Sequence, residues 1–244
     1  MQSVRALILG AGRGKRMRPL SDSTPKPLLR FHGKRMIDWQ IDALIRAGVR
    51  DFVVNTAHLA DQFPAQLGDG HERGITIRYS KEGDSEEEAL ETLGGIAKAL
   101  PLLSPDGVTP FIVAAGDIVT EFDYSRLTAR ADALMRGDAD AHLVLVPNPA
   151  FHAAGDMALE NGLVRRAPQA LTFSSIGIYS PRIFKGVPAV RAKLFPWLYH
   201  FADLGRVTGE LFTGEWRNIG TPEQLNAPRT GKSQTSRRRL IGGA

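Results

Sequence analysis

The chain has 244 residues, 43% of them hydrophobic and 23% charged, which is the balance of an ordinary globular protein with a substantial core. It contains no cysteine, which excludes disulfides, thiolate metal sites and a cysteine nucleophile. No apolar stretch approaches the roughly 20 residues that a membrane helix needs, and the N-terminus lacks the pattern of a signal peptide. We therefore expect a cytoplasmic protein with no membrane partner.

The net charge of +5 belongs mainly to the C-terminal end of the chain. Residues 227–244 hold five of the 31 Lys and Arg residues and none of the 26 Asp and Glu residues, so the remainder is neutral. We interpret 1–226 as a single domain and 227–244 as a basic, disordered tail, and we expect no nucleic-acid partner. The cations of this tail are Arg229, Lys232, Arg237, Arg238 and Arg239.

Short apolar runs alternate with amphipathic stretches over residues 1–146. Unpatterned apolar strands between helices predict an α/β fold, with a mostly parallel, Rossmann-like sheet and helices on both faces. The predicted strands are Arg5–Leu9, Asp51–Thr56, Ile75–Tyr79, Phe111–Ala115 and Ala141–Val146. The predicted helices are Met36–Ala47, Ala60–Leu67, Thr92–Leu100, which Pro101 should end, and Ser125–Arg136.

Residues 147–226 show a different rhythm of shorter elements. We predict a hairpin that turns at Asn161–Gly162, then two helical stretches and two closing strands. The predicted strands are Met157–Glu160, Leu163–Arg166, Leu171–Tyr179, Val207–Phe212 and Glu215–Ile219, and the helices are Arg182–Lys185 and Val190–Phe201.

A glycine-rich loop follows the first predicted strand. Glycines let the backbone turn sharply and bring its N–H groups close to an anion, and four basic residues within six positions would meet polyphosphate. A Walker loop is excluded because Arg16 follows Lys15, and the dinucleotide fingerprint needs a glycine where Lys15 stands. The segment reads Leu9-Gly10-Ala11-Gly12-Arg13-Gly14-Lys15-Arg16-Met17-Arg18-Pro19-Leu20, followed by Thr24-Pro25-Lys26-Pro27.

The loop and its Pro-Lys-Pro resemble the start of the sugar-1-phosphate nucleotidylyltransferases. The resemblance implies a glycosyltransferase-A-like fold, with a nucleotide-binding half over about 1–146 and a sugar-phosphate half over about 147–226. It implies that Arg16 binds the polyphosphate and assists the departing pyrophosphate, and that Lys26 bridges the reacting phosphates. Leu90–Gly95 resembles the family's base-recognising segment, although Glu91 replaces a glycine there. The implied nucleotide-binding residues are Leu9, Gly10, Ala11, Gly12, Gly14, Lys15, Thr92 and Gly94.

Two residues are candidates for holding a magnesium ion. Asp117 follows a predicted strand, and ligands of parallel sheets sit beyond the carboxyl ends of the strands. The resemblance implies that Asp117 ligates Mg²⁺, the expected cofactor. Trp216-Arg217-Asn218-Ile219-Gly220-Thr221 resembles the family's Trp-x-Asp-x-Gly-Thr, so Asn218 takes the place of the second ligand and should bind more weakly.

The short length and the motifs around Glu91 and Phe173 resemble the members of the family that act on N-acetylmuramate 1-phosphate. The implied reaction transfers UMP from UTP to this sugar phosphate and releases pyrophosphate, so both substrates are expected partners. The candidate sugar-binding residues are Gly155, Asp156, Phe173 and Ser174.

Other hypotheses stay open at this point, as does the oligomeric state. The acceptor could be glucose or mannose 1-phosphate, with dTTP or GTP as donor. A glycosyltransferase would use an Asp-x-Asp motif, which Asp138-Ala139-Asp140 supplies, although before a strand rather than after one. A non-catalytic nucleotide-sugar sensor would keep the loop and lose Arg16, Lys26 or Asp117, all of which are present.

Overall fold

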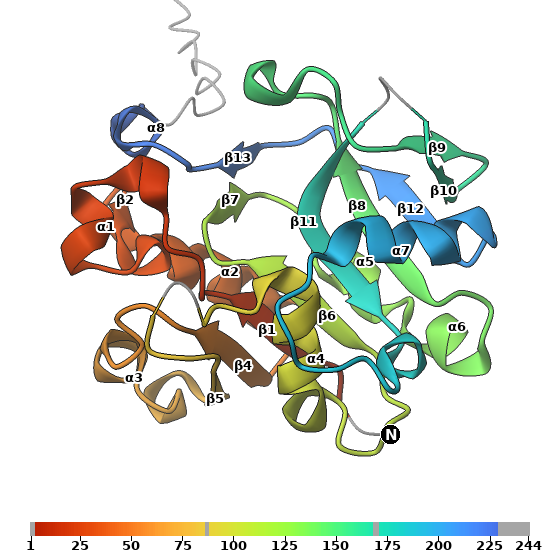
Figure 1. Cartoon of the computed structure of the whole chain (residues 1–244), viewed down its shortest axis with the longest axis horizontal. Coiled ribbons are helices and arrows are strands. Elements are labelled where there is room, and N and C mark those ends of the chain that lie inside the picture. The colour runs from red at the N-terminus through yellow and green to blue at the C-terminus, as the bar shows by residue number, and fades with distance from the viewer. Residues whose placement is uncertain (1–2, 86–87, 168–170, 229–244) are drawn as a thin grey trace, which may run out of the picture.

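A computed structural model describes residues 3–85, 88–167 and 171–228, so the predicted tail lies outside the described residues except for Ala227 and Pro228. Its centre is a nine-stranded sheet of order β5-β4-β1-β6-β11-β8-β12-β10-β9 (Figure 1), in which only β11 and β10 run against the other strands. The predicted α/β class with a largely parallel sheet is confirmed. The strands are β1 (Arg5–Leu9), β4 (Asp51–Thr56), β5 (Thr76–Lys81), β6 (Phe111–Ala115), β8 (Ala141–Val146), β9 (Ala158–Glu160), β10 (Leu163–Arg165), β11 (Thr172–Tyr179) and β12 (Val207–Leu211).

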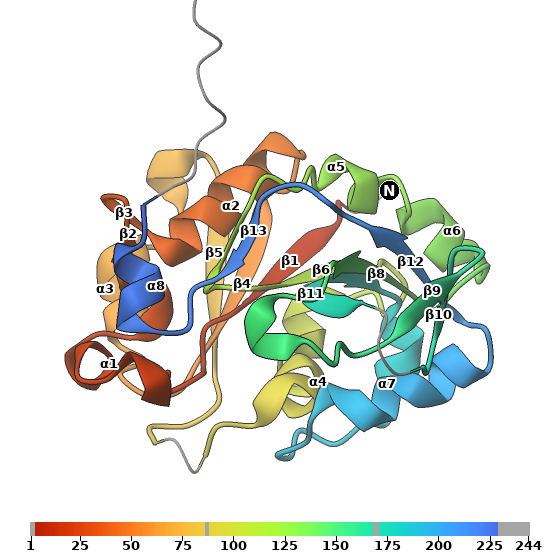
Figure 2. The same ribbon diagram turned by 90° about the horizontal axis from the view of Figure 1, so that it is seen from above.

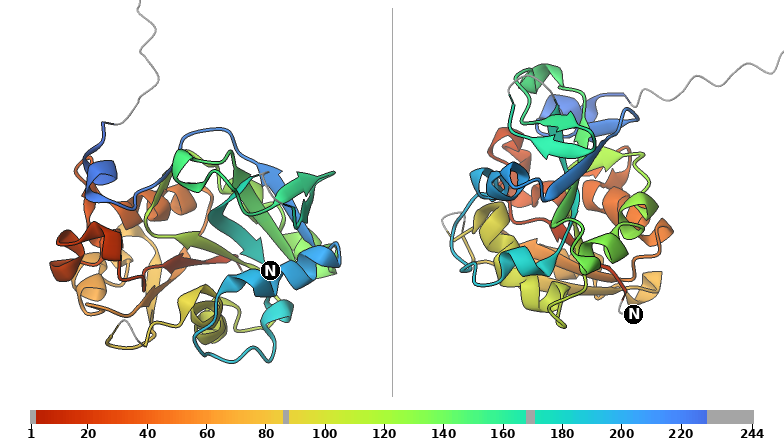
Figure 3. Two further views of the ribbon diagram at one scale, coloured as in Figure 1. Left: turned by 45° about the horizontal axis from the view of Figure 1, so that its top comes forward. Right: turned by 90° about the vertical axis from the view of Figure 1, so that its right-hand side faces the viewer.

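Helices cover both faces of the sheet (Figures 2 and 3), and each layer buries its own apolar cluster. On one face, Ile37, Ile41 and Leu44 of α2 recur at helical spacing and are fully buried against β1 and β4. On the other face, α4 packs over β1, β4 and β5, and α7 packs over β10 and β12. The first layer contains α2 (Met36–Arg46), α3 (Gln62–Leu67), α5 (Ser125–Thr128) and α6 (Ala131–Arg136), and the second contains α4 (Glu91–Leu103) and α7 (Leu194–Asp203).

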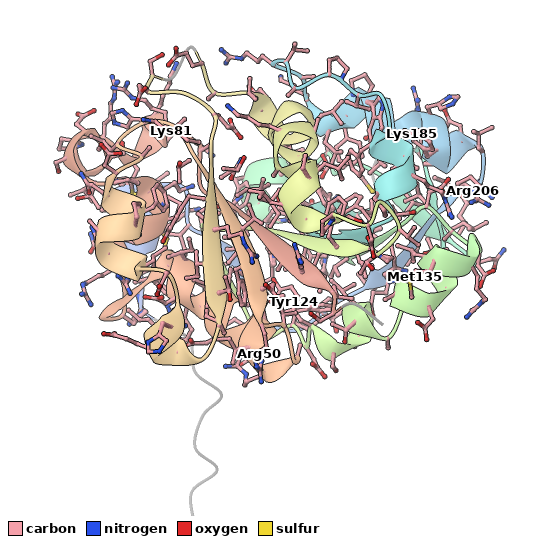
Figure 4. The ribbon with its side chains drawn as sticks, turned by 90° about the horizontal axis from the view of Figure 1, so that it is seen from below. Arg50, Lys81, Tyr124, Met135, Lys185 and Arg206 are labelled. Carbon is pink, nitrogen blue, oxygen red and sulfur yellow. The ribbon has the colours of Figure 1, made fainter. Side chains whose placement is uncertain are left out.

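Short elements gather at the carboxyl edge of the parallel strands. The chain returns to this edge in β13 (Trp216–Asn218), which pairs antiparallel with β7 (Ile118–Thr120) in a separate two-stranded sheet. Gln40 on α2 donates to the Ile118 carbonyl at 2.6 Å, and it accepts a hydrogen bond from the buried Tyr124 hydroxyl (labelled in Figure 4). The other elements here are η1 (Lys15–Met17), α1 (Leu20–Ser23), η2 (Lys26–Leu28), β2 (Arg30–Phe31), β3 (Lys34–Arg35) and α8 (Pro222–Asn226).

Three predicted helix boundaries are wrong. The α4 helix runs past Pro101 to Leu103, because the missing Pro101 N–H costs one bond while the Ser104 N–H still reaches the Leu100 carbonyl at 2.9 Å. The single helix predicted over 125–136 is split into α5 and α6, with Ala129 and Arg130 between them. The helix predicted from Val190 begins only at Leu194.

The two edges of the sheet lie on opposite sides of the molecule. Figure 1 shows the edge strand β5 on the opposite side from the edge strand β9, and Figure 4 shows Lys81, at the end of β5, far from Arg206, which precedes β12. The remaining short helical turns are η3 (His71–Arg73), η4 (Ala150–His152) and η5 (Pro181–Phe184). Among the described residues, none of the helices is long and apolar enough to cross a membrane.

Candidate active site

A cavity of about 440 Å³ opens at the carboxyl ends of β1, β4 and β6, where an open parallel sheet places its ligands. It brings together Arg16, Lys26 and Asp117 from three separate segments of the chain. Its lining is Leu9, Ala11, Gly12, Arg13, Gly14, Lys15, Arg16, Lys26, Pro27, Asn55, Glu82, Ala89, Glu91, Thr92, Ala115, Asp117, Arg191 and Gly220. Of the predicted nucleotide-binding residues, Gly10 and Gly94 lie outside this lining.

The glycine-rich loop packs tightly around Lys26. Gly14 has a φ of 65° and caps η1, and a Cβ atom there would come within 3.0 Å of the Lys26 Cβ. The Ser21 hydroxyl donates to the Gly14 carbonyl at 2.9 Å and fixes the turn. Gly10 lies behind the loop, where a Cβ atom would meet the Asn55 carbonyl at 2.8 Å. The glycines therefore allow a close packing that larger residues would disrupt.

Lys26 and Asp117 form an ion pair inside this cavity. The Lys26 ammonium donates to Asp117 Oδ2, and only 8% of the Lys26 residue is exposed. Arg16 lies across the same opening, since a Cβ atom on Gly220 would come within 3.3 Å of its guanidinium. With the other charged residues of the lining, five cations and three carboxylates surround this space, and the excess of cations suits a ligand with several phosphate charges.

Asn218 lies beside Asp117 although it is 101 residues away in sequence. Asn218 pairs with Ile118 across β13 and β7, and the Ile219 N–H donates to the Asp117 carbonyl at 3.1 Å. The side-chain oxygen of Asn218 is buried and has no hydrogen-bond partner among the described residues. Burying an unpaired acceptor costs free energy unless a donor or a cation binds it. The Asn218 oxygen and the neighbouring Asp117 carboxylate are oxygen ligands, which fit a hard cation such as Mg²⁺. Within the described ranges, no group of three His, Cys, Asp or Glu residues could hold a metal ion.

A hydrogen-bonded chain, which the sequence analysis missed, joins the glycine loop to the base-recognising segment. Asn55 accepts from the Gly10 N–H at 2.7 Å and donates to Glu82 at 2.5 Å, and Glu82 accepts from the Leu90 N–H at 2.7 Å. Burial raises the pKa of Glu82 above its ordinary value of 4.5, and the hydrogen bonds from Leu90 and Asn55 only partly oppose this. Asn55 could have been noticed as a polar residue after the apolar run of β4.

The start of α4 forms the wall between this cavity and the next. Glu91 and Thr92 line both cavities. Glu91 has a φ of 59°, a left-handed conformation that glycine adopts most easily, which explains why the family pattern has a glycine at this position. Glu91 pairs with Arg191 at 3.6 Å. Gly94 packs against backbone, since a Cβ atom there would come within 2.0 Å of the Val190 carbonyl.

A second cavity of about 260 Å³ shares Leu9, Glu91 and Thr92 with the first. It lies between β6 and β11 on the side covered by α4 and α7. Its remaining lining is Val113, Phe173, Ser175, Tyr179, Lys193, Leu194 and Phe195. Burial raises the pKa of Tyr179, so its hydroxyl stays protonated.

The four predicted sugar-binding residues differ in where they point. Phe173 lines the second cavity, whereas the Ser174 hydroxyl is fully buried and donates to the Val144 carbonyl at 2.7 Å. Ser175 lines the cavity in its place, because the pairing of β11 with β8 is irregular between Phe173 and Gly177 and Ser175 has a φ of 62°. No pattern in the sequence predicts this irregular pairing.

Asp156 and Gly155 line neither cavity. Asp156 accepts from the Phe173 N–H at 2.8 Å and lies 2.9 Å from His152 Nε2, so it orients the strand that carries Phe173. Gly155 has a φ of 65° and packs against the side chain of Asn148, where a Cβ atom would come within 2.7 Å.

The Asp-x-Asp motif is turned away from both cavities. Asp140 precedes β8, at the amino edge of the parallel strands, and its carboxylate binds Arg182 and Arg206. Asp138 pairs with the exposed Arg136. These contacts occupy both carboxylates in structural ion pairs, which leaves the glycosyltransferase hypothesis without its ligand site.

Comparison with known proteins identifies the family. The family model described as nucleotidyl transferase matches residues 5–166, which carry the glycine loop, Lys26 and Asp117. The chain belongs to the nucleotidyl transferase family. The sequence-based resemblance rested on the glycine loop and on the Pro-Lys-Pro segment. Residues of the loop, Lys26 and Pro27 line the first cavity of this nucleotidyl transferase.

Two curated relatives cover nearly all of this nucleotidyl transferase. An N-acetylmuramate alpha-1-phosphate uridylyltransferase from Neisseria meningitidis serogroup B is 44% identical over 223 residues, which is 89% of this chain and 94% of the relative. A protein of the same name from Caulobacter vibrioides is 34% identical, with 89% and 92% covered. A solved structure assigned as a glucose-1-phosphate thymidylyltransferase from Bacillus anthracis superposes with a TM-score of 0.76 at 19% identity, covering 91% of this chain and 92% of that one, and supports the fold.

Proposed function

We propose that the protein transfers UMP from UTP to N-acetylmuramate 1-phosphate, releasing pyrophosphate and forming the UDP-sugar. The observation that carries the choice of substrates is the 44% identity, over 94% of its length, to a relative named for this activity. The site supports the reaction class, because Arg16, Lys26 and Asp117 line one cavity at the carboxyl edge of the sheet. Because UTP is a cytoplasmic metabolite, we place the reaction in the cytoplasm.

The chemistry needs positioning more than proton transfer. An oxygen of the sugar-1-phosphate attacks the α-phosphorus of UTP, and the bond from that phosphorus to the pyrophosphate oxygen breaks. The attacking phosphate is already anionic near neutral pH, so no general base is required. Lys26 and Arg16 neutralise the charge that develops on the α-phosphate and on the departing pyrophosphate. The backbone of the loop at 10–14 holds the triphosphate, and Thr92 borders both substrates.

Asp117 and Asn218 are the residues that would hold Mg²⁺. When bound, the ion would neutralise negative charge on the reacting phosphates. Lys26 pairs with Asp117 in this structure, so the carboxylate orients the ammonium as well as offering oxygen ligands. The Asn218 amide brings no charge of its own to this site.

Phe173 is the predicted sugar-binding residue with the strongest structural support, since it lines the cavity next to the nucleotide. Its ring meets Phe195 edge to face at a centroid distance of 5.6 Å, which holds both rings in place. Asp156 and Gly155 support this wall from behind. Ser174 supports the strand through its bond to Val144, and we propose Ser175 as the serine that reaches the sugar.

A pyrophosphate-release assay tests both substrates at once. The purified protein is incubated with Mg²⁺ and each of UTP, dTTP, GTP and ATP against N-acetylmuramate, N-acetylglucosamine, glucose and mannose 1-phosphates. We expect the highest kcat/KM for UTP with N-acetylmuramate 1-phosphate. A higher value for dTTP with glucose 1-phosphate or for GTP with mannose 1-phosphate would replace the proposed substrates. No release with any pair would favour a nucleotide-sugar sensor.

A further inference from the structure

The second cavity holds an unpaired cation in mostly apolar surroundings. Its walls are the side chains of Leu9, Val113, Phe173, Tyr179, Leu194 and Phe195. Lys193 lies at its rim, at the N-cap of α7, and in the described part of the chain no carboxylate pairs with the Lys193 ammonium. The other charges at this boundary are already matched, since Glu91 pairs with Arg191.

The wall of the same cavity includes a buried polar group with no partner among the described residues. The Tyr179 hydroxyl is fully buried and makes no hydrogen bond within the described residues. It lies over Gly177, where a Cβ atom would come within 3.1 Å of the hydroxyl oxygen. An unsatisfied buried donor beside a cavity is costly unless a ligand oxygen meets it. The cavity is therefore suited to a ligand group that combines apolar atoms with oxygen acceptors.

N-acetylmuramate differs from N-acetylglucosamine by a lactyl ether on its third carbon. This substituent adds a methyl group, which suits apolar walls, and a carboxylate, which needs a cation when it leaves water. From these observations we infer that Lys193 is a specificity-determining residue that binds the lactyl carboxylate of the acceptor in the second cavity. The inference rests on the proposed function and extends it to one side chain.

Binding of the sugar's phosphate is the competing role for Lys193. The 1-phosphate must approach the α-phosphate of the nucleotide, and the first cavity already supplies cations for that step. These are Arg13, Lys15, Arg16, Lys26 and Arg191. Lys193 lines only the second cavity, beyond the wall formed by Glu91 and Thr92. Its position places it near the substituents of the sugar ring, away from the reacting atoms.

The test compares Lys193→Met with wild type on two acceptors that differ only in the lactyl group. We expect KM for N-acetylmuramate 1-phosphate to rise roughly 10- to 100-fold, as for the loss of a charged hydrogen bond, with kcat and the KM for UTP little changed. KM for N-acetylglucosamine 1-phosphate should stay within about twofold, since it has no carboxylate to lose. If that acceptor is not turned over, its inhibition constant against N-acetylmuramate 1-phosphate serves instead.

Two further variants complete the design. Lys193→Arg keeps the charge and should recover most of the affinity for N-acetylmuramate 1-phosphate. Lys185→Met removes an exposed lysine that lines neither cavity (Figure 4) and should leave both acceptors unaffected. An equal loss on both acceptors in Lys193→Met, or no loss on either, would overturn the inference. If wild type does not accept N-acetylmuramate 1-phosphate at all, the proposed function itself fails, which is a different result.

Discussion

At the scale of single residues, Lys26 is unusual because it is a buried lysine, and most lysines are exposed. Only 8% of Lys26 is exposed, and its side-chain nitrogen donates a hydrogen bond to the Asp117 carboxylate inside the cavity wall. Its backbone is fixed between Pro25 and Pro27 at the start of η2. The ammonium is therefore preorganised for an anionic ligand, and it need not reorganise when that ligand arrives.

We predict that Lys26→Met lowers kcat by about 10²- to 10³-fold, the usual cost of losing one donor to a developing charge. Lys81→Met is the control, since Lys81 is an exposed lysine that lines neither cavity. Steady-state kinetics give the turnover, and circular dichroism shows whether the variant is folded. Wild-type turnover in folded Lys26→Met would remove this residue from the mechanism.

A second prediction concerns Asn218 and the affinity of the site for magnesium. Replacing Asn218 by Asp adds a negative charge next to Asp117, so the magnesium concentration for half-maximal activity should fall, because ligand charge strengthens binding of hard cations. Asp117→Ala should remain folded and show very little activity at any magnesium concentration. The measurement is a magnesium titration at fixed UTP and acceptor. An unchanged midpoint in Asn218→Asp together with robust activity in Asp117→Ala would locate the metal elsewhere.

The sequence predicted the residues of the first cavity better than those of the second. Lys26 was singled out by the Pro-Lys-Pro motif and Asp117 by its place after a strand, and the structure joins the two in one ion pair. The sequence did not show whether Ser174 or Ser175 faces the second cavity. The irregular pairing of β11 breaks the alternation of side chains, and only the folded strand shows which serine faces the cavity.

At the scale of elements, Asp140 ties the start of β8 to the segments before β12 and at η5. Burial alone would raise the pKa of Asp140, but hydrogen bonds from Arg206 and Arg182 outweigh it and hold the pKa below its ordinary value of 3.8. A carboxylate whose pKa is lower in the folded than in the unfolded protein adds stability above its unfolded pKa. That stability is lost as the pH falls through the folded pKa.

We predict that Asp140→Asn lowers the free energy of unfolding by about 1–2 kcal/mol at pH 7, allowing for the solvent that reaches both arginines. The deficit should shrink as the pH falls below about 4, because Asp140 of the unfolded chain takes up a proton first and the folded carboxylate, whose pKa is lower, follows on further acidification. Urea unfolding at several pH values measures it. Asp138→Asn, in an exposed pair with Arg136, is the control and should change stability by less than about 0.5 kcal/mol. An Asp140→Asn deficit that grows on acidification would refute this account.

Buried strands were more predictable than helix ends. Phe111–Ala115 is apolar at every position and Ala141–Val146 at every position except His142, and the structure forms strands with the predicted bounds. Helix boundaries depend on single hydrogen bonds, such as the one from Ser104 that carries α4 past Pro101. Composition and periodicity do not report such bonds.

At the scale of the whole molecule, the sequence did not predict the order of the strands. The inner strand β11 runs antiparallel between β6 and β8, although it follows them in the chain. The predicted closing strand at 215–219 pairs with β7 outside the main sheet and so brings Asn218 to Asp117. Both pairings join segments far apart in sequence, and local patterns carry no information about them.

The C-terminal boundary of the fold supports a fourth prediction. The last described residues still make contacts, since the Ala227 carbonyl meets His32 at 3.1 Å and the Pro228 carbonyl accepts from Arg217 at 3.2 Å. Deleting residues 229–244 spares these bonds and should leave kcat/KM and the melting temperature nearly unchanged. Deletion from Pro222 onward removes the capping box of α8 beside the Gly220 turn and should reduce both. A large loss from the shorter deletion would give the tail a structural or catalytic role.

In the proposed reaction, the sugar phosphate attacks the α-phosphorus of UTP. Parallel reactions with α-³²P-labelled and γ-³²P-labelled UTP and N-acetylmuramate 1-phosphate, separated by chromatography, test it directly. The α label should appear in the UDP-sugar and the γ label in pyrophosphate, in equal amounts. The γ label in a sugar product, or the α label in free UMP without any UDP-sugar, would contradict the claim.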